Sequence, residues 1–413
     1  MSPIRTAPAA LRAGDADQRA RYLDEVLGVL YPAPCLTNRG RSTVDKPIAE
    51  YLIVPNARQP RLLVPAHDRR LAAAAVRRYA EPQSRLGRLG RGAVVAALRT
   101  GASAVLLRDR VRVTGRDHDT FETYLARLFG AGLSLSVHIG PARANRKPVL
   151  QLLTADGRTV AFAKLGTVAL TRGLVRAEAA ALIALKHAGL TQVTVPTVLH
   201  SGQWRDHEVL VQSALPVWRP RVPVTEPRLV SAMKEVAGCC GTRRGALADS
   251  GYWSRLRTRL DGVAGSPDGA QLAAAGAAIV RRHAAVRLDY GAWHGDWSPW
   301  NMASLDDTLL VWDWERFTPG VPIGLDALHH DLQRRLMAQP DARAAVEQTL
   351  DAAARLLLPF GVVDPAATTG TALLYLVDLA ARYLADRQAE AGARLGVLGR
   401  WLLPAILDRV EMS

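Results

Sequence analysis

Two short stretches near residue 300 decide how this sequence is interpreted. The first is His294-Gly-Asp-Trp-Ser-Pro-Trp-Asn301, and the second is Leu309-Leu-Val-Trp-Asp-Trp-Glu315. Gly295 and Pro299 interrupt regular structure in the first stretch, which is therefore predicted to be a loop. The second stretch begins with an apolar run that is typical of a short buried strand, and this run delivers Asp313 at its end.

The spacing of three polar residues in these stretches indicates a metal site. Asn301 lies five residues after Asp296 on the loop, and Asp313 lies twelve residues further on, across a turn at Asp306-Asp307. This arrangement can place two carboxylates and one amide oxygen around a common point. Mg²⁺ prefers such hard oxygen ligands, typically one or two carboxylates together with substrate phosphates. The alternative is an Asx-rich turn that caps helices.

The motif pair resembles the aminoglycoside phosphotransferase/choline kinase branch of the protein-kinase-like superfamily, over about residues 131–413. The resemblance implies an α+β protein with a two-lobed protein-kinase-like fold, in which a five-stranded antiparallel N-lobe precedes a helical C-lobe. It also implies an ATP-dependent phosphotransferase with an alcohol group as acceptor. In that family Asp296 would be catalytic, accepting or orienting the proton of the acceptor hydroxyl, while Asn301 and Asp313 would hold Mg²⁺. His294 is expected to tie the loop through its ring nitrogens.

Residues 131–216 carry the pattern expected of the N-lobe. Polar and apolar residues alternate from Leu133 to Ile139, and Asp156-Gly157 is a strong hairpin signal. A helix between the third and fourth strands completes a small α+β lobe. The predicted strands cover residues 133–139, 149–153, 159–164, 193–199 and 208–212, and the predicted helix covers residues 174–188.

Lys164 and Glu178 are the candidate phosphate clamp. Lys164 stands at the end of the third predicted strand and is one of five lysines in the chain. Phosphoryl transfer needs a cation on the nucleotide phosphates, and the resemblance places Lys164 in that role. Glu178 lies fourteen residues further on and could pair with Lys164. The alternatives are a lysine that faces solvent and a surface glutamate.

Two further segments are candidate nucleotide contacts. Arg143, in the loop of residues 140–147, could contact phosphates or belong to a solvated basic turn. The backbone from Gln212 to Ala214 falls where the family binds the adenine edge. ATP is favoured over GTP because it is the commoner nucleotide in the family, and GTP is not excluded. Asp326 is expected to buttress the catalytic loop.

The remaining regions carry no motif. Residues 1–130 are predicted to be a basic α/β accessory domain with 22 basic and 12 acidic residues, and residues 217–413 the helical C-lobe with the acceptor site. The glycines within residues 85–92 argue against a long regular helix there. Other predicted elements are helices over residues 17–30, 69–79, 227–239, 271–288, 340–358 and 372–384, the last continuing beyond Leu402, and a hairpin of residues 51–54 and 62–64.

Composition excludes several classes of protein. The 413 residues carry a net charge of +15, but 48 of the 53 basic residues are arginine, which indicates a composition bias more than a phosphate-binding face. No nucleic-acid-binding motif accompanies the charge. No run is apolar enough for a membrane span or a secretory signal. The odd number of cysteines, three, favours free thiols in the cytoplasm.

The sequence leaves the acceptor open. A small-molecule kinase could phosphorylate a sugar, an aminoglycoside, an amino alcohol or a similar acceptor. A polycationic acceptor would need an acidic C-lobe pocket, for which the C-terminal helices offer Asp331, Asp378, Asp386 and Glu390. The alternative function is a catalytically silent kinase-like module that binds a nucleotide or an anionic macromolecular partner through the basic N-terminal region.

Overall fold

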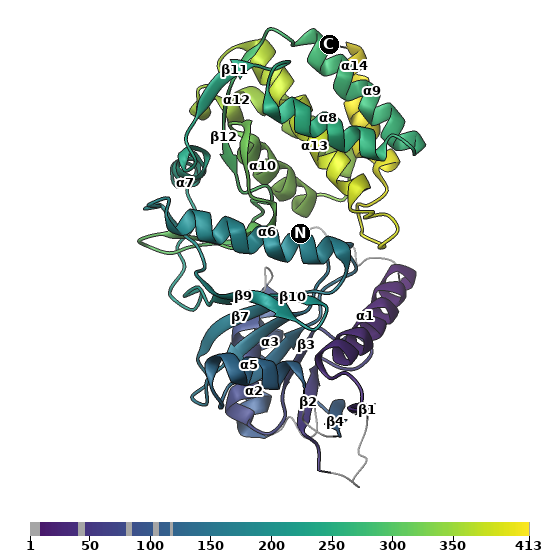
Figure 1. Cartoon of the computed structure of the whole chain (residues 1–413), viewed down its shortest axis with the longest axis vertical. Helices are drawn as coiled ribbons and strands as arrows, with labels where there is room; N and C mark the ends of the chain where they lie inside the picture. The colour runs from purple at the N-terminus through teal and green to yellow at the C-terminus, as the bar shows by residue number, and fades with distance from the viewer. Residues whose placement is uncertain (1–8, 40–45, 80–84, 102–106, 116–118, 413) are drawn as a thin grey trace. The chain divides into compact units, whose positions relative to one another are not determined.

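The computed structural model describes residues 9–39, 46–79, 85–101, 107–115 and 119–412 of the chain. The protein has a mixed α+β fold with a large antiparallel sheet and many helices (Figure 1). The chain forms two compact units. The first contains residues 1–142, 146–175 and 198–214, and the second contains residues 143–145, 176–197 and 215–413.

A nine-stranded antiparallel sheet forms the centre of the first unit. The five strands predicted for the N-lobe lie at one end, and strands from the N-terminal region continue the same sheet. The two groups are joined where Leu62 and Leu63 pair with His138 and Val137. In sheet order the strands are β1 (Leu36–Arg39), β4 (Arg110–Thr114), β2 (Ala49–Val54), β3 (Leu62–Pro65), β5 (Ser134–His138), β6 (Val149–Leu153), β7 (Thr159–Gly166), β10 (His207–Ser213) and β9 (Val198–Trp204).

The structure therefore has no boundary at residue 131, where a separate accessory domain was predicted to end. The hydrogen-bonding edge of β3 continues directly into β5, so the N-terminal strands and the predicted lobe share one sheet. Pairing the two edges satisfies backbone groups that an isolated domain would leave exposed. The chain instead passes between the two units several times, for the last time after Ala214, just beyond the end of β10.

Both faces of β2, from Tyr51 onward, and of β3 are buried, which explains the continuous apolar runs of these two strands. In β2, Tyr51 and Ile53 pack into one core with α1 (Ala9–Leu30) and α5 (Phe121–Phe129). Leu52 and Val54 pack on the opposite face, because successive side chains of a strand alternate. Helices α2 (Arg69–Tyr79) and α3 (Arg85–Thr100) provide that second core.

The doubt about a long helix at residues 85–92 was wrong. Helix α3 runs without interruption through Gly90 and Gly92, and a Cβ at either glycine would meet nothing within 4 Å. Leu98 of α3 is completely buried, and Val94 and Val95 pack beside it. This packing stabilises the helix against the cost of about 1 kcal/mol per glycine.

Most of the second unit is helical and packs around one central helix. Helix α13 lies among α8, α9 and α10 (Figure 1), and fourteen of its residues are buried. In the described residues no single helix is long and apolar enough to cross a membrane; Ala353–Phe360 and Pro365–Ala385 reach that length and apolar composition only when taken together, as a pair bent by 105°. The helices are α7 (Glu226–Gly238), α8 (Gly251–Val263), α9 (Pro267–Arg282), α10 (Leu325–Ala338), α11 (Ala342–Asp351), α12 (Ala353–Leu357), α13 (Pro365–Ala385) and α14 (Leu402–Met412).

Several predicted helix bounds in this unit were wrong. The helix predicted to reach residue 288 ends at Arg282, because Arg287–Trp293 forms a strand, β12, between β11 (Arg243–Ala246) and β15 (Thr318–Pro322). Helix α13 ends at Ala385 and does not continue towards residue 402. Helices α8 and α10 were not predicted. Residues 287–293 form a strand because they pair with strands that are distant in the sequence. Local periodicity does not report such pairing.

Two short strand pairs carry the motif residues. β13 (Met302–Ser304) pairs with β14 (Leu309–Val311), and β14 pairs in parallel with β8 (Val193–Thr194). Residues 193–199 were predicted as one strand of the N-lobe. The structure divides this run around Pro196, so that β8 joins the second unit and β9 begins at Val198 in the large sheet.

Candidate active site

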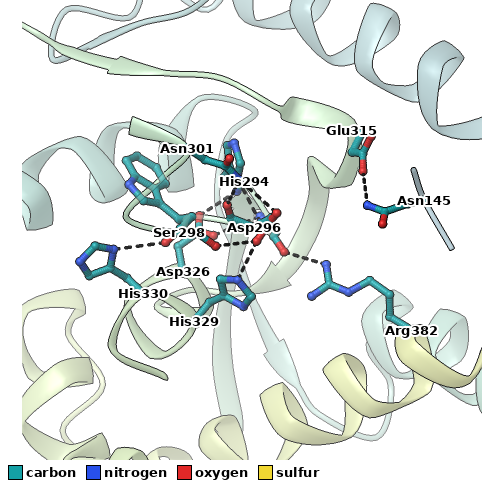
Figure 2. A network of polar contacts seen from close by, with 12 residues as sticks. Asn145, His294, Asp296, Ser298, Asn301, Glu315, Asp326, His329, His330 and Arg382 are labelled. Carbon is teal, nitrogen blue, oxygen red and sulfur yellow. Dashed lines mark hydrogen bonds and ion pairs between the residues drawn. The ribbon is translucent and has the colours of Figure 1, made fainter. Parts of the chain in front are cut away.

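The loop of residues 294–301, here called the catalytic loop after the role predicted for Asp296, is held in place through its backbone. Asp326, in the first turn of α10, accepts hydrogen bonds from the backbone N–H groups of His294 (2.7 Å) and Gly295 (3.1 Å). Arg382 of α13 donates to the carbonyl of Gly295 at 2.7 Å (Figure 2). Burial raises the pKa of Asp326 to about 7 against the lowering effect of the two N–H groups. The predicted buttressing role of Asp326 is thus observed.

His294 connects the catalytic loop to the segment that carries Asp313. Its Nδ1 accepts from the backbone N–H of Asp296 (3.1 Å), so its Nε2 carries the proton that is donated to the carbonyl of Trp312 (3.1 Å). The ring is completely buried, and burial lowers the pKa of His294 to about 4. A neutral imidazole with one donor and one acceptor satisfies both contacts, which matches the structural role expected from the sequence.

Asp296 is surrounded by hydrogen-bond donors. Oδ1 accepts from Ser298 Oγ (2.7 Å) and from His329 Nε2 (3.0 Å), and Oδ2 accepts from Asn301 Nδ2 (3.0 Å). A carboxylate oxygen has two lone pairs, so Oδ1 is saturated and Oδ2 keeps one lone pair. The side chain is 32% exposed, which leaves this lone pair within reach of a substrate.

The pKa of Asp296 reflects a balance of burial and donors. Burial raises the pKa, whereas the hydrogen bonds from His329 and Ser298 lower it. The negative charge of Asp313 also raises the pKa, by a smaller amount. Together these effects place the pKa of Asp296 below the ordinary value of an aspartate, so Asp296 is ionised at neutral pH.

Asn301 and Asp313 flank the hairpin of β13 and β14. Met302 pairs with Val311, and the backbone N–H of Trp312 donates to the carbonyl of Asn301 at 3.0 Å. The side-chain amide of Asn301 donates to both the backbone carbonyl and Oδ2 of Asp296, so its Oδ1 points away from Asp296. Asp313 adopts a left-handed backbone conformation (φ 73°, ψ 53°), which is uncommon outside glycine and typical of strained functional positions.

The oxygen atoms near Asp313 fit a divalent cation. Carboxylate oxygens of Glu178, Asp313 and Glu315 all lie within 4.8 Å of one another. Glu178 is fully buried and Glu315 is 5% exposed, and Asn145 donates to Glu315 Oε1 at 2.9 Å (Figure 2). Hard oxygen donors of this kind suit Mg²⁺. The residues present therefore fit a magnesium ion at the end of β14.

Not all predicted site residues lie in the same unit. Asp296, Asn301, Asp313 and Glu178 belong to the second unit, together with Arg143. The other three, Lys164, Gln212 and Ala214, belong to the first unit.

In the first unit, Lys164 lies on β7 between Val149 of β6 and Leu210 of β10, and it is 6% exposed. The expected pairing of Lys164 with Glu178 stays a prediction. The backbone N–H of Ala214 donates to the carbonyl of Val160 at 3.0 Å, so this donor extends the sheet and is not available to a nucleobase. Gln212 is buried at the end of β10.

Sequence reasoning missed four residues of the site. Glu315 stands in the quoted motif, and its place two residues after Asp313 is a signal that could have identified it as a ligand. Ser298, likewise, lies within the loop motif. His329 and Arg382 have no comparable signal, because they come from helices far along the chain and reach the loop only through packing.

The chain is similar to solved structures of small-molecule kinases. One is a choline kinase from Streptococcus pneumoniae, with 13% identity, a TM-score of 0.48, and 71% of this chain and 98% of that chain covered. A thermostable mutant of aminoglycoside phosphotransferase APH(4)-Ia has 14% identity and a TM-score of 0.45, with 70% and 98% covered. An amicoumacin kinase in complex with AMP-PNP, Ca²⁺ and Ami has 11% identity and a TM-score of 0.42, with 70% and 92% covered. No protein-family model and no curated protein matches the sequence.

Proposed function

We propose that this protein is a kinase that transfers the γ-phosphate of ATP to a hydroxyl group of a small molecule. The observation that carries the proposal is the environment of Asp296. Its carboxylate is ionised, fixed by three side-chain donors, partly exposed, and left with one lone pair on Oδ2. Such a group can accept a proton from a hydroxyl, which is the task of the catalytic aspartate in phosphoryl transfer.

In the proposed reaction, the acceptor hydroxyl donates a hydrogen bond to Oδ2 of Asp296. The hydroxyl oxygen forms a bond to the γ-phosphorus, the bond from that phosphorus to the β–γ bridging oxygen breaks, and the proton passes to Oδ2. ADP carries away the electron pair of the broken bond. A magnesium ion held by Asp313 and the neighbouring carboxylates of Glu178 and Glu315, with Asn301 as the fourth predicted ligand, would neutralise negative charge on the phosphates. We assign Lys164 to the phosphates of the nucleotide.

The charges near α13 favour a neutral or anionic acceptor. The three buried aspartates that could have received a polycation are already paired with arginines, and breaking such a pair leaves an uncompensated buried charge. Glu390, the fourth acidic candidate, is exposed. A sugar or another uncharged polyol therefore fits better than an aminoglycoside. The pairs are Asp386 with Arg316, Asp378 with Arg259 (2.6 Å), and Asp331 with Arg334 (2.8 Å) and Arg335 (2.5 Å).

The test is an acceptor screen that follows ADP release from ATP and Mg²⁺, with Asp296→Asn beside the wild type. We expect the variant to bind ATP in calorimetry as the wild type does and to turn over about 10²–10⁴-fold more slowly. Asp249→Asn, at an exposed aspartate of the same unit, serves as the control. Equal turnover by Asp296→Asn would remove Asp296 from the chemistry. ATP binding without turnover by the wild type would favour the catalytically silent module.

A further inference from the structure

Two buried side chains behind Asp296 form a hydrogen-bonded chain that ends on its carboxylate. His329 of α10 contacts Asp296 Oδ1 through Nε2 at 3.0 Å, and Tyr375 of α13 contacts His329 Nδ1 through its hydroxyl at 3.1 Å. His329 is 2% exposed and Tyr375 is 1% exposed. Water therefore has little access to either contact, and the partners of each nitrogen are fixed by the protein.

The chemistry of the three groups fixes where the protons lie. An ionised carboxylate only accepts hydrogen bonds, so Nε2 of His329 must carry a proton. Burial lowers the pKa of His329, which keeps the ring neutral, and Nδ1 is then an acceptor. Burial also holds the pKa of Tyr375 well above its ordinary value, so the phenol keeps its proton and donates it to Nδ1. All donors in the chain point towards Asp296.

The same two helices also hold the backbone of the catalytic loop. On α10, Asp326 binds the backbone N–H groups of the loop, and His329, three residues later, binds the carboxylate. On α13, Arg382 binds the carbonyl of Gly295, and Tyr375 lies seven residues earlier. Residues three or seven apart lie on one face of a helix, so each helix presents one contact to the loop backbone and one to the chain of donors.

We propose that His329, with its tautomer set by Tyr375, is a positioning residue that saturates Oδ1 of Asp296 and leaves Oδ2 as the oxygen that receives the acceptor proton. The inference rests on the proposed function. Nε2 already carries a proton, so His329 does not take the transferred proton from Asp296. Its effect is to fix the plane of the carboxylate, because a carboxylate turned out of this plane no longer directs the free lone pair of Oδ2 at the acceptor hydroxyl. Groups that fix the orientation of a reacting ligand in this way typically contribute about 10–100-fold to activity.

The test compares His329→Leu, His329→Gln and Tyr375→Phe in the full-length protein, with ATP and Mg²⁺ as substrates and water as the acceptor. We expect His329→Leu to lower kcat by about 10–100-fold with an unchanged KM for ATP. The side-chain amide of glutamine can place a donor near the position of Nε2, so His329→Gln should recover much of the loss. Tyr252→Phe is the control, because Tyr252 is also buried and its hydroxyl donates to Leu374, away from the loop.

Long-range ¹H–¹⁵N NMR spectra of the histidine rings give a readout that does not depend on turnover. We expect the Nε2-protonated tautomer for His329 in the wild type and a mixture of tautomers in Tyr375→Phe. An Nδ1-protonated ring in the wild type would overturn the proposal, and so would a folded His329→Leu protein with the kcat of the wild type. Failure of the proposed function is seen separately, as equal turnover by Asp296→Asn and the wild type.

Discussion

At Gly295, the addition of a single methyl group should push the catalytic loop away from the segment that carries Asp313. It has a φ of 82°, and a Cβ placed there would lie 2.5 Å from the carbonyl oxygen and 2.9 Å from the Cβ of Arg316. Arg316 ends the short helical turn that begins directly after Asp313. The Gly295→Ala substitution therefore forces the catalytic loop away from the segment with the metal ligands.

The size of the effect follows from these distances. Ordinary contact begins at 3.4 Å, so the two backbones must separate by about 0.9 Å, and a displacement near 1 Å in an active site costs about 100-fold in rate. The left-handed backbone costs about 1–2 kcal/mol for a residue with a Cβ. Overpacking adds about 1–3 kcal/mol to the loss of stability. We therefore expect Gly295→Ala to lose both catalytic rate and stability.

Gly361→Ala provides a matched control. Gly361 also has a φ of 82° and belongs to the same unit, but a Cβ there would meet nothing within 4 Å. Urea unfolding should show the backbone cost alone in Gly361→Ala and a larger loss in Gly295→Ala, and only Gly295→Ala should lower ADP release. Equal stability of the two variants, with wild-type turnover in Gly295→Ala, would refute the reasoning.

Two further predictions concern the groups that hold the loop. Asp326→Asn keeps one acceptor oxygen and loses the other, so one buried N–H group of the loop loses its partner. Urea unfolding should show that the free energy of unfolding falls by about 1–3 kcal/mol. Unchanged stability would contradict this role of Asp326. His294 has a pKa lowered from 6.5 to about 4, so the unfolded chain binds a proton that the folded protein does not bind at intermediate pH. The contribution of His294 to the free energy of unfolding is fully present above pH 6.5. It should decrease by about 3 kcal/mol as the pH falls towards 4. When unfolding is measured at several pH values, the free energy of unfolding should depend less steeply on pH in His294→Asn than in the wild type. The substitution His187→Asn, at an exposed position, should leave the slope as it is in the wild type.

The strands and their partners were predictable to different degrees. The hairpin of β2 and β3 and the helix α2 follow from apolar runs and turn residues that are close in sequence. The pairing of β3 with β5 joins residues that are more than seventy positions apart. No local pattern reports which sheet edges meet, so residues 1–130, which lie outside the family resemblance, were predicted to form a separate domain.

The sequence by itself determined the relation of Asp296, Asn301 and Asp313. These residues lie within eighteen positions of one another, and the register of a single hairpin brings them together. Only the tertiary structure decided how Asp296 is oriented. His329, Tyr375 and Arg382 reach the loop because α10 and α13 pack in one particular rotation within the core. That rotation depends on the packing of many buried side chains at once, and spacing along the chain does not record it.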